Sequence, residues 1–456
     1  MEFRGSAIIR YFALKSLFFL QLGASRLKKS ALLPVVLVVA SFSFLSCGSS
    51  PSKLATRVLA SQSVSSPSAA PGLVLINGYD DTLVRGTISA GNSPGLMALT
   101  PNRALVLAFD SASNNVEVIN SVRQIQEGNI QLPGPTYSMV ALASGSAYAA
   151  VPTAPMNAGP APGAVEVLNI TSGGITATLS VPAAQTVVSS PDGSHILAFS
   201  NDSDVVTVIY PLLVNLSTPT TATVPGFDRP VNAVFSADGS TAYVLNCGPE
   251  CGSGSASASV QTLNIATLAV GAPVPVDGAT IGWLSGSTLY VAGTPTASVS
   301  NPAPNNACQT NTPKVCGRLD LVDVGSMTVT GSAVITDGYH DRIDMSVNGQ
   351  LFVGSYTCTN IGNVNNPQGG EVRGCLSIYN TANGVVVIPP DNGDVTGFQS
   401  FTTRDVEYVA EGGNLRVYDT LTDSLLLDNN NNPNLPETGT IVITGYIIDV
   451  KAIDFF

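Results

Sequence analysis

Ser236-Ala-Asp-Gly-Ser-Thr-Ala-Tyr-Val-Leu-Asn246 is the stretch of sequence that decides the fold. Its Asp238-Gly239 step supplies the positive φ that a tight hairpin turn requires. The next six residues, Thr241–Asn246, form an apolar run of strand length. A further run, Ser259–Asn264, ends in Asn, whose side chain can cap the turn that follows. This order of turn, strand and Asn-ended strand predicts antiparallel β-structure.

The same order recurs along the chain from residue 73. Comparable turns occur at Ser190-Pro191-Asp192-Gly193-Ser194 and Ser346-Val347-Asn348-Gly349. Second strands are predicted at Ala104–Phe109, Ser146–Val151, His195–Ser200, Thr241–Asn246, Thr288–Gly293, Gln350–Ser355 and Val406–Glu411. Third strands that end in Asn or Asp are predicted at Asn115–Asn120, Ala164–Asn169, Ser259–Asn264, Arg318–Asp323, Cys375–Asn380 and Asn414–Asp419. A weaker fourth strand closes each unit, as in Ile175–Val181 and Val385–Ile388.

Seven four-stranded units that repeat about every 40–60 residues are typical of a β-propeller. We therefore predict an all-β fold, with one propeller domain over residues 73–456. Leu73–Ser89 and Gly439–Asp454 are left over from the seven units and could form one split blade, with Leu73–Asn77 and Thr82–Ile88 as its third and fourth strands. Such a blade would join the two ends of the ring. The strand count favours eight blades, whereas family frequency favours seven.

The composition fits a fold of strands and turns. Charged residues make up 11% of the 456 residues and aromatic residues 6%, alongside 43 Gly and 30 Pro, which argues against helix bundles and coiled coils. The 44% of hydrophobic residues argues against general disorder. Of 31 acidic and 19 basic residues, Glu2 and six bases precede Cys47, so the remainder carries 30 acids, 13 bases and a net charge of −17. Nucleic acid is therefore not an expected partner.

The first 47 residues read as an export signal. Arg26, Lys28 and Lys29 precede the 15-residue apolar run Ala31–Leu45, which ends at Ser46-Cys47-Gly48. Phe44-Leu45-Ser46-Cys47 resembles a bacterial lipobox, and this resemblance implies that Cys47 becomes the lipidated first residue, although the family usually has Leu where Phe44 stands. The alternative is an ordinary signal peptide with a stray Cys. Residues 48–72 are rich in Ser, Ala and Pro, which predicts a flexible linker.

The repeats also carry a family resemblance. Leu75-Ile-Asn-Gly-Tyr-Asp-Asp81, the Val-x-Val-Ile/Leu-Asn third strands and the Ser-Pro-Asp-Gly turn are similar to the YVTN/YncE-like propeller repeats of bacterial exported proteins. That superfamily includes the lactonase-like propellers. The resemblance covers residues 73–456 and implies the fold rather than a reaction. The chain departs from it in long Cys-bearing loops and in degenerate turns such as Thr402-Thr403-Arg404.

Six cysteines besides Cys47 predict disulfides in an exported chain. Six cysteines allow fifteen pairings, and position in the repeat selects the three pairs within one second-to-third-strand connection each: Cys247–Cys251, Cys308–Cys316 and Cys358–Cys375. A zinc site at Cys247 and Cys251 is the rival interpretation, but no His lies nearby in the sequence. We therefore expect no metal.

The long insertions fall in the same connections. They are Val151–Gly163, Gly248–Ala258, Gly293–Gly317 and Ser355–Gly374, and in a propeller they share one face. Loops longer than about 12 residues are usually functional or disordered, and crosslinks argue against disorder. Neutral drift in loop length is the alternative.

Two blade-to-blade connections on that face carry candidate catalytic residues. They contain Asp228 and Arg229 in one, and His340, Asp341 and Arg342 in the other. Asp, Arg and His at a channel mouth would suit acid–base chemistry or a carboxylate clamp. The competing interpretation is that these residues form ordinary ion pairs between blades.

Other motifs indicate no chemistry. Gly91-Asn92-Ser93-Pro94-Gly95 matches a nucleophile elbow on paper, but no helix follows and Pro94 lacks the N–H that an oxyanion hole needs. Asp428–Asn432 lacks the ligand spacing of a calcium loop. His195 is expected at the surface and Trp283 beside the channel. No cofactor is indicated.

The sequence thus predicts a binding or interaction module of the cell envelope, either anchored to the outer membrane or periplasmic. The membrane, through the lipid anchor, and an envelope protein or glycan are the expected partners, and a monomer is the expected state. The alternative is a lactonase-like hydrolase with its site in the central funnel, around Asp228, Arg229, His340, Asp341 and Arg342.

Overall fold

The computed structural model describes most of the chain from residue 56 onward. The described residues are 56–63, 71–155, 162–211, 219–255, 257–296, 316–358, 361–362, 372–389, 393–426, 440–441, 443 and 445–454. Residues 1–54 and 55–456 form separate units, and only the second unit contains described residues. Within these ranges no helix is long and apolar enough to cross a bilayer.

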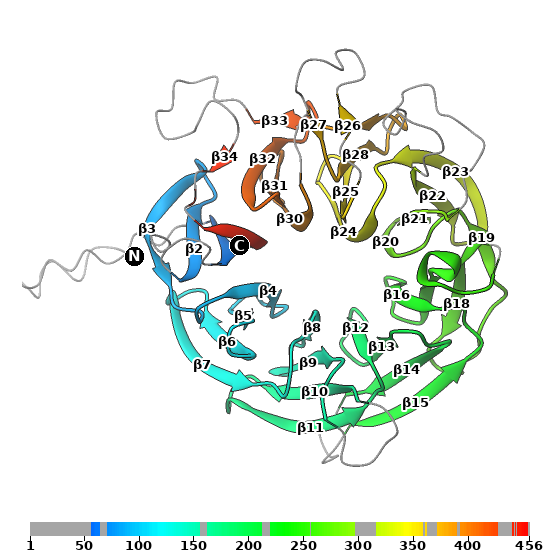
Figure 1. The fold of residues 1–456 in the computed structure, drawn as a ribbon, viewed down its shortest axis with the longest axis horizontal. Helices are drawn as coiled ribbons and strands as arrows, with labels where there is room; N and C mark the ends of the chain where they lie inside the picture. Colours follow the sequence, from blue (N-terminus) through cyan, green and yellow to red (C-terminus); the bar gives the residue numbers. More distant parts are fainter. Residues whose placement is uncertain are drawn as a thin grey trace, which may run out of the picture. The chain divides into compact units, whose positions relative to one another are not determined.

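The second unit is a β-propeller of eight four-stranded antiparallel blades, which confirms the predicted fold and the larger blade number. Figure 1 shows the blades arranged around a central axis. From the innermost strand outward, blade 1 contains β35 (Tyr446–Asp454), β1 (Thr56–Ser63), β2 (Gly72–Asn77) and β3 (Thr82–Ile88). Blade 2 contains β4 (Pro94–Leu99), β5 (Leu105–Asp110), β6 (Asn115–Asn120) and β7 (Ile125–Gln131). Blade 3 contains β8 (Ser138–Ala141), β9 (Ser146–Val151), β10 (Ala164–Asn169) and β11 (Gly174–Ser180).

The next three blades follow the same order. Blade 4 contains β12 (Ala184–Ser189), β13 (Ile196–Ser200), β14 (Val205–Tyr210) and β15 (Thr220–Pro225). Blade 5 contains β16 (Pro230–Phe235), β17 (Thr241–Asn246), β18 (Ala258–Asn264) and β19 (Val274–Val276), with the 3₁₀ turn η1 (Gly248–Cys251) in its loop. Blade 6 contains β20 (Ile281–Ser285), β21 (Thr288–Gly293), β22 (Gly317–Asp323) and β23 (Thr328–Ile335).

The last two blades carry additional short strands. Blade 7 contains β24 (Tyr339–Met345), β25 (Gln350–Tyr356), β28 (Leu376–Asn380) and β29 (Val386–Val387), with the separate pair β26 (Ile361–Gly362) and β27 (Val372–Arg373). Blade 8 contains β30 (Val395–Ser400), β31 (Val406–Glu411), β32 (Asn414–Asp419) and β33 (Ser424–Leu425), and β34 (Thr440–Ile441) pairs with β32. The predicted second and third strands match these bounds to within about a residue.

The core lies between the blades. Second and third strands are buried on both sides, as in β9 and β10, because each blade packs both faces against its neighbours. Each cluster of buried residues accordingly combines two consecutive blades, for example Leu197 of blade 4 with Val244 of blade 5. Outermost strands such as β11 alternate between exposed and partly buried residues. Apolar side chains are therefore concentrated on the two middle strands of a blade.

Polar residues in the middle of the third strands also tie blades together. Gln261 Nε2 donates to Gly226 O at 3.2 Å, Asp320 accepts from Asp277 N at 2.6 Å, and Ser377 Oγ accepts from Thr336 N at 3.0 Å. In each case the partner belongs to the connection that arrives from the preceding blade. This repeated contact was not predicted, although the polar residue recurs at the third position of the third-strand motif.

Blade 1 closes the ring through strands from both ends of the chain. β35 pairs with β1 over Thr56–Ser63, and β35 also contacts the innermost strands β30 and β4 of the neighbouring blades. The predicted split blade is thus present, with β2 and β3 as its third and fourth strands. Its second strand, β1, lies within residues 48–72, so the prediction of a flexible linker over this whole segment was wrong.

The propeller has two unlike faces. The loop face carries the connections from second to third strands and from one blade to the next, and the turn face carries the short turns. The sulfur atoms of Cys247 and Cys251, and of Cys358 and Cys375, are bonded on the loop face, with Cα separations of 5.7 and 5.5 Å. Both separations lie in the usual disulfide range. Cys308 lies outside the described residues, so its pairing with Cys316 stays a prediction.

On the turn face a buried ion pair joins blade 8 to blade 1. Arg404 Nη1 and Nη2 each lie 2.7 Å from one carboxylate oxygen of Asp81, in a two-pronged contact. Tyr408 OH also donates to Asp81, and Asp81 is buried. The turn Thr402-Thr403-Arg404, which departs from the Asp-Gly pattern, therefore supplies the contact at the closure of the ring.

We predict that Arg404→Ala lowers the free energy of unfolding by about 3–5 kcal/mol, because it leaves the Asp81 carboxylate buried without its cation. Arg123→Ala is the matched control: Arg123 pairs with Glu127 on the surface and its side chain is 66% exposed, so the loss should be about 0–1 kcal/mol. Denaturant unfolding of both variants measures the difference. Equal losses would show that the Asp81 contact adds nothing to ring closure.

Candidate functional site

The candidate site lies on the loop face, where β24 begins. Gly338 precedes the strand with a φ of +95°, and a Cβ at this position would lie 2.6 Å from Tyr356 O, so only glycine fits. The pairing of β24 with β25 shifts between His340 and Arg342, which makes Asp341 the extra residue of a β-bulge. Bulges redirect side chains at sheet ends. Here the bulge separates the environment of His340 from that of the two residues after it.

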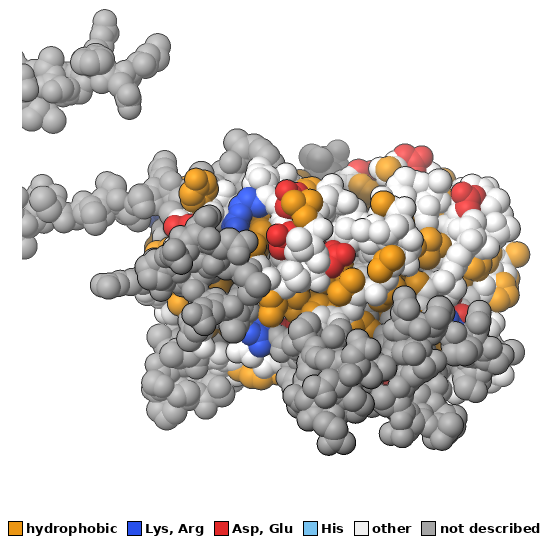
Figure 2. Space-filling model, turned by 90° about the horizontal axis from the view of Figure 1, so that it is seen from above, with side chains coloured by type: hydrophobic (Ala, Val, Ile, Leu, Met, Phe, Trp, Pro, Cys, Tyr) orange, Lys and Arg blue, Asp and Glu red, His pale blue; other side chains and the backbone are white. Residues whose placement is uncertain are grey.

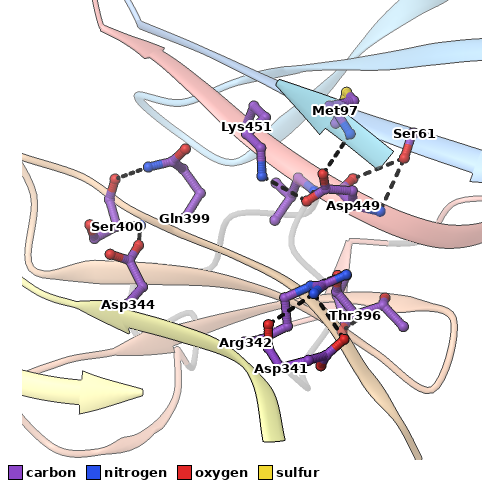
Figure 3. Close-up of polar contacts among 12 residues, drawn as sticks. Ser61, Met97, Asp341, Arg342, Asp344, Thr396, Gln399, Ser400, Asp449 and Lys451 are labelled. Atoms are coloured by element: carbon purple, nitrogen blue, oxygen red, sulfur yellow. Dashed lines mark hydrogen bonds and ion pairs between the residues drawn. The ribbon is translucent and has the colours of Figure 1, made fainter. Parts of the chain in front are cut away.

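Asp341 and Arg342 form an ion pair at this bulge. Arg342 Nη1 lies 2.9 Å from Asp341 Oδ2, and Arg342 Nε donates to Thr396 O of blade 8 at 2.6 Å. Figure 3 shows the two side chains pointing toward each other, with Thr396 beside them. Both side chains are partly exposed. Burial raises the pKa of Asp341, although the guanidinium of Arg342 opposes this shift.

Two tyrosines and a glutamate lie beside the ion pair. The rings of Tyr339 and Tyr356 have their centroids 5.3 Å apart. Glu250 of η1 accepts a hydrogen bond from Thr294 N at 3.0 Å. Burial raises the pKa of Tyr339 and of Tyr356, and the negative charges of Glu250 and Asp341 raise both further. We call Glu250, Tyr339, Asp341, Arg342 and Tyr356 the mouth cluster.

Glu250 is a weak acid in this cluster. Burial raises its pKa to about 8, although the hydrogen bond from Thr294 opposes the shift. At neutral pH its carboxyl is therefore mostly protonated and can donate a hydrogen bond. The sequence prediction missed Glu250, because its only signal was its position between Cys247 and Cys251 in a short crosslinked loop.

The side chain of His340 is not exposed beside the mouth cluster. Its side chain is fully buried, and Nε2 lies 3.0 Å from Thr336 O, so Nε2 carries the proton and donates it to that carbonyl. Among the described residues Nδ1 has no hydrogen-bond partner. Burial lowers the pKa of His340 to about 4, so the ring is neutral at pH 7. A Cβ on Gly317 would lie 2.8 Å from this ring, so the space around it is filled.

Asp228 and Arg229 are held elsewhere, between blades 4 and 5. Asp228 accepts hydrogen bonds from Ser253 Oγ at 3.2 Å and from Ser255 Oγ, and so fixes the loop that follows η1. Arg229 Nη1 lies 2.9 Å from Asp202 Oδ1 in the preceding blade. The five candidate residues therefore divide into an ion pair at the mouth, a buried imidazole, and two residues that join neighbouring blades.

Other residues singled out in the sequence have structural surroundings. His195 is partly buried, with Nδ1 2.7 Å from Ser194 Oγ and its ring 5.3 Å from that of Tyr210. Trp283 lies on the innermost strand β20 and packs against the core between blades 6 and 7. Ser93 donates its N–H to Asp110 at 2.7 Å and leads directly into β4. Cys47 and Asp428–Asn432 lie outside the described residues.

The remaining polar contacts near the axis are structural. Asp344 of β24 accepts from Ser400 N of blade 8 at 2.8 Å, and Asp449 of β35 accepts from Met97 N of blade 2 at 2.8 Å (Figure 3). Lys451 also pairs with Asp449. No group of three or more metal-ligating side chains occurs among the described residues. Figure 2 shows charged side chains as few and scattered on the side it presents, in keeping with the composition.

Of the following comparisons with known proteins, one supports the fold. No protein-family model matches the chain, and no curated protein matches it in sequence. The dihydro-heme d1 dehydrogenase NirN superposes with a TM-score of 0.56 at 9% identity, over 88% of this chain and 75% of that one. The periplasmic gluconolactonase PpgL of Pseudomonas aeruginosa gives 0.47 at 15% identity, over 87% and 99%. A putative 6-phosphogluconolactonase of Bacteroides uniformis gives 0.49 at 13% identity, over 87% and 99%.

We predict that the stability of the protein falls as the pH rises from about 4.5 to about 8, since the unfolded chain releases the Glu250 proton in this range while the folded protein keeps it. The Glu250→Gln variant has no ionisable group at this position. Its free energy of unfolding should therefore decline by up to about 1.4 kcal/mol less per pH unit than that of the parent. Urea unfolding at pH 5 and pH 8 measures the effect. Glu127→Gln, on the surface, should keep the decline of the parent. The same decline in Glu250→Gln would show that Glu250 ionises freely in the folded state.

Proposed function

We propose that this protein is an exported, lipid-anchored binding module whose ligand site is the mouth cluster. The observation that carries the proposal is an exposed tyrosine ring beside charged side chains that can form hydrogen bonds. Tyr356 is 37% exposed, and it lies beside the partly exposed Asp341–Arg342 ion pair. A few polar groups next to aromatic rings are typical of sites that bind small molecules. Disulfides in the loops of blades 5 and 7 support the site from two sides.

The ligand class that fits best is a neutral saccharide. Arg342 offers N–H donors, and sugar hydroxyls can accept hydrogen bonds from them. The tyrosine rings offer an apolar face with a polar tip. A chain with a net charge of −17 after Cys47 would repel phosphate-rich polymers. Envelope glycans are therefore the partner that we favour over nucleic acids.

The buried His340 supports binding rather than hydrolysis. A general base must come within hydrogen-bond reach of the proton that it removes, and the His340 ring is enclosed. The Asp341 carboxylate is occupied by Arg342. Lactone hydrolysis at this site would therefore need a group other than the paired carboxylate or the imidazole.

The location and the family are proposed from the sequence alone. The basic residues and apolar run before Cys47, together with Phe44-Leu45-Ser46-Cys47, support export and lipidation. The Val-x-Val-Ile/Leu-Asn strands support membership of the YVTN/YncE-like propellers. In this proposal the protein is a monomer of the cell envelope held at a membrane by the lipid on Cys47.

We predict that Tyr356→Ala weakens oligosaccharide binding at least about 10-fold, which corresponds to about 1.4 kcal/mol, because the aromatic face beside Arg342 is lost. Tyr137→Ala is the matched control, since Tyr137 is 60% exposed in the connection that leads to β8, on the loop face of another blade. An array of bacterial surface oligosaccharides followed by calorimetry with a positive compound gives the affinities.

Absence of binding to every oligosaccharide, or equal losses in the two tyrosine variants, would contradict the proposal. The same preparations should also be assayed for hydrolysis of δ-gluconolactone. A hydrolytic activity that Asp341→Asn abolishes would favour the hydrolase.

A further inference from the structure

The turns between third and fourth strands are built alike but differ in one exposed position. In the seven described turns, which belong to all blades except blade 4, an Asn or Asp at the end of the third strand accepts hydrogen bonds from backbone N–H groups two or three residues later. Examples are Tyr79 N to Asn77 at 3.2 Å, Val122 N to Asn120 at 3.0 Å and Leu421 N to Asp419 at 2.8 Å. The side chain two residues after the Asn or Asp is therefore held at the turn face.

Large apolar residues occupy this position in only three of the seven described turns. They are Leu421, Tyr79 and Val122, with exposed fractions of 67%, 83% and 46%. The other four described turns carry Thr171, Ala266, Gly325 and Ala382 at the same position. The corresponding turn of blade 4 lies outside the described residues. We call Leu421, Tyr79 and Val122 the apolar arc.

The three residues of the apolar arc belong to blades 8, 1 and 2, which are consecutive in the closed ring. Arg404 of blade 8 contacts both Asp81 and Gly78 O in the turn that holds Tyr79. Arg57 Nη1 of blade 1 donates to Ser121 O, next to Val122, at 2.7 Å. These buried contacts fix the three turns relative to one another.

The first strand of the propeller, β1, begins beside this arc. β1 starts at Thr56 on the turn face, and Thr56 O accepts a hydrogen bond from Gly78 N, the residue before Tyr79, at 3.1 Å. Cys47 lies nine residues earlier in the sequence. Nine residues span at most about 30 Å even when fully extended. A lipid on Cys47 would therefore keep the arc within this distance of the membrane surface.

We propose that the apolar arc seats on the lipid surface to which Cys47 anchors the chain, an inference that rests on the proposed lipidation. Tyrosine suits the boundary between water and acyl chains, and lipid anchors are commonly assisted by a second contact. Both acidic and basic residues stand next to the arc in the sequence, as with Asp80 and Arg123. The arc therefore does not require anionic lipid, and a neutral lipid surface is sufficient for the proposed contact. The mouth cluster, on the opposite face, then points away from the membrane.

The experiment uses the full-length lipidated protein in phosphatidylcholine vesicles and single tryptophan substitutions at the shared turn position. Tyr79→Trp and Leu421→Trp report on the arc, and Ala266→Trp reports on blade 5, on the other side of the ring (Figure 1). The parent, which contains Trp283, provides the background. Flotation of the vesicles first shows whether the protein is bound.

Brominated phosphatidylcholine should then quench the added emission of Tyr79→Trp and Leu421→Trp at least about twofold more than that of Ala266→Trp, because quenching requires contact with the acyl region. Bound protein with equal quenching at all three positions, or with no quenching, would overturn the proposed seating while leaving the anchor intact. Protein that does not float would reject the anchor, and the seating with it.

Discussion

Closure of the ring between β35 and β1 is the constraint on which the rest of the structure depends. Every other blade is built from one continuous segment, whereas blade 1 pairs strands that are almost 400 residues apart in sequence. Without this pairing, blade 1 would lose its innermost strand, and β30 and β4 would each lose a neighbour. Buried apolar residues on both strands, such as Val58 and Val450, and the Asp81–Arg404 pair hold the closure together. In the closed ring the sheets keep only short edges, which the ring protects.

The closed ring also explains why side chains from several blades meet on one face and not on the other. Short Asx turns are sufficient on the turn face, because each one only reverses the chain within a blade. The loop face receives the connections of neighbouring blades, so side chains from several blades meet there. The mouth cluster combines Glu250 of blade 5 with the β24 and β25 residues of blade 7, and Arg342 reaches Thr396 of blade 8. Two loops with disulfides border it.

Local patterns were sufficient to predict most of the fold but not the site. Strands such as Thr241–Asn246 and Asn115–Asn120 could be predicted because each lies next to a turn whose residues are recognisable in sequence, before the first strand and after the second. β1 was missed for two reasons. Thr56–Ser63 lies in a Ser- and Ala-rich stretch, and its partner strand β35 is far away in the chain. Asp341 and Arg342 are adjacent in the sequence, so their ion pair is compatible with a local pattern. The burial of His340 depends on the bulge at Asp341, and the raised pKa of Glu250 depends on Thr294, 44 residues later. Neither is visible in a local pattern.

Native-state hydrogen exchange of the amides in β1 and β35 tests the central role of ring closure most directly. If closure holds the propeller together, these amides exchange only through global unfolding, with the same free energy of opening as the amides of β21 and β22 in blade 6. The amide of Val58 is a suitable reporter, because Val58 is fully buried and lies in the ladder. The amide of Val450 is not, because it donates to Asp449 Oδ1. Exchange of β1 and β35 at a much lower free energy, while blade 6 stays protected, would contradict the account.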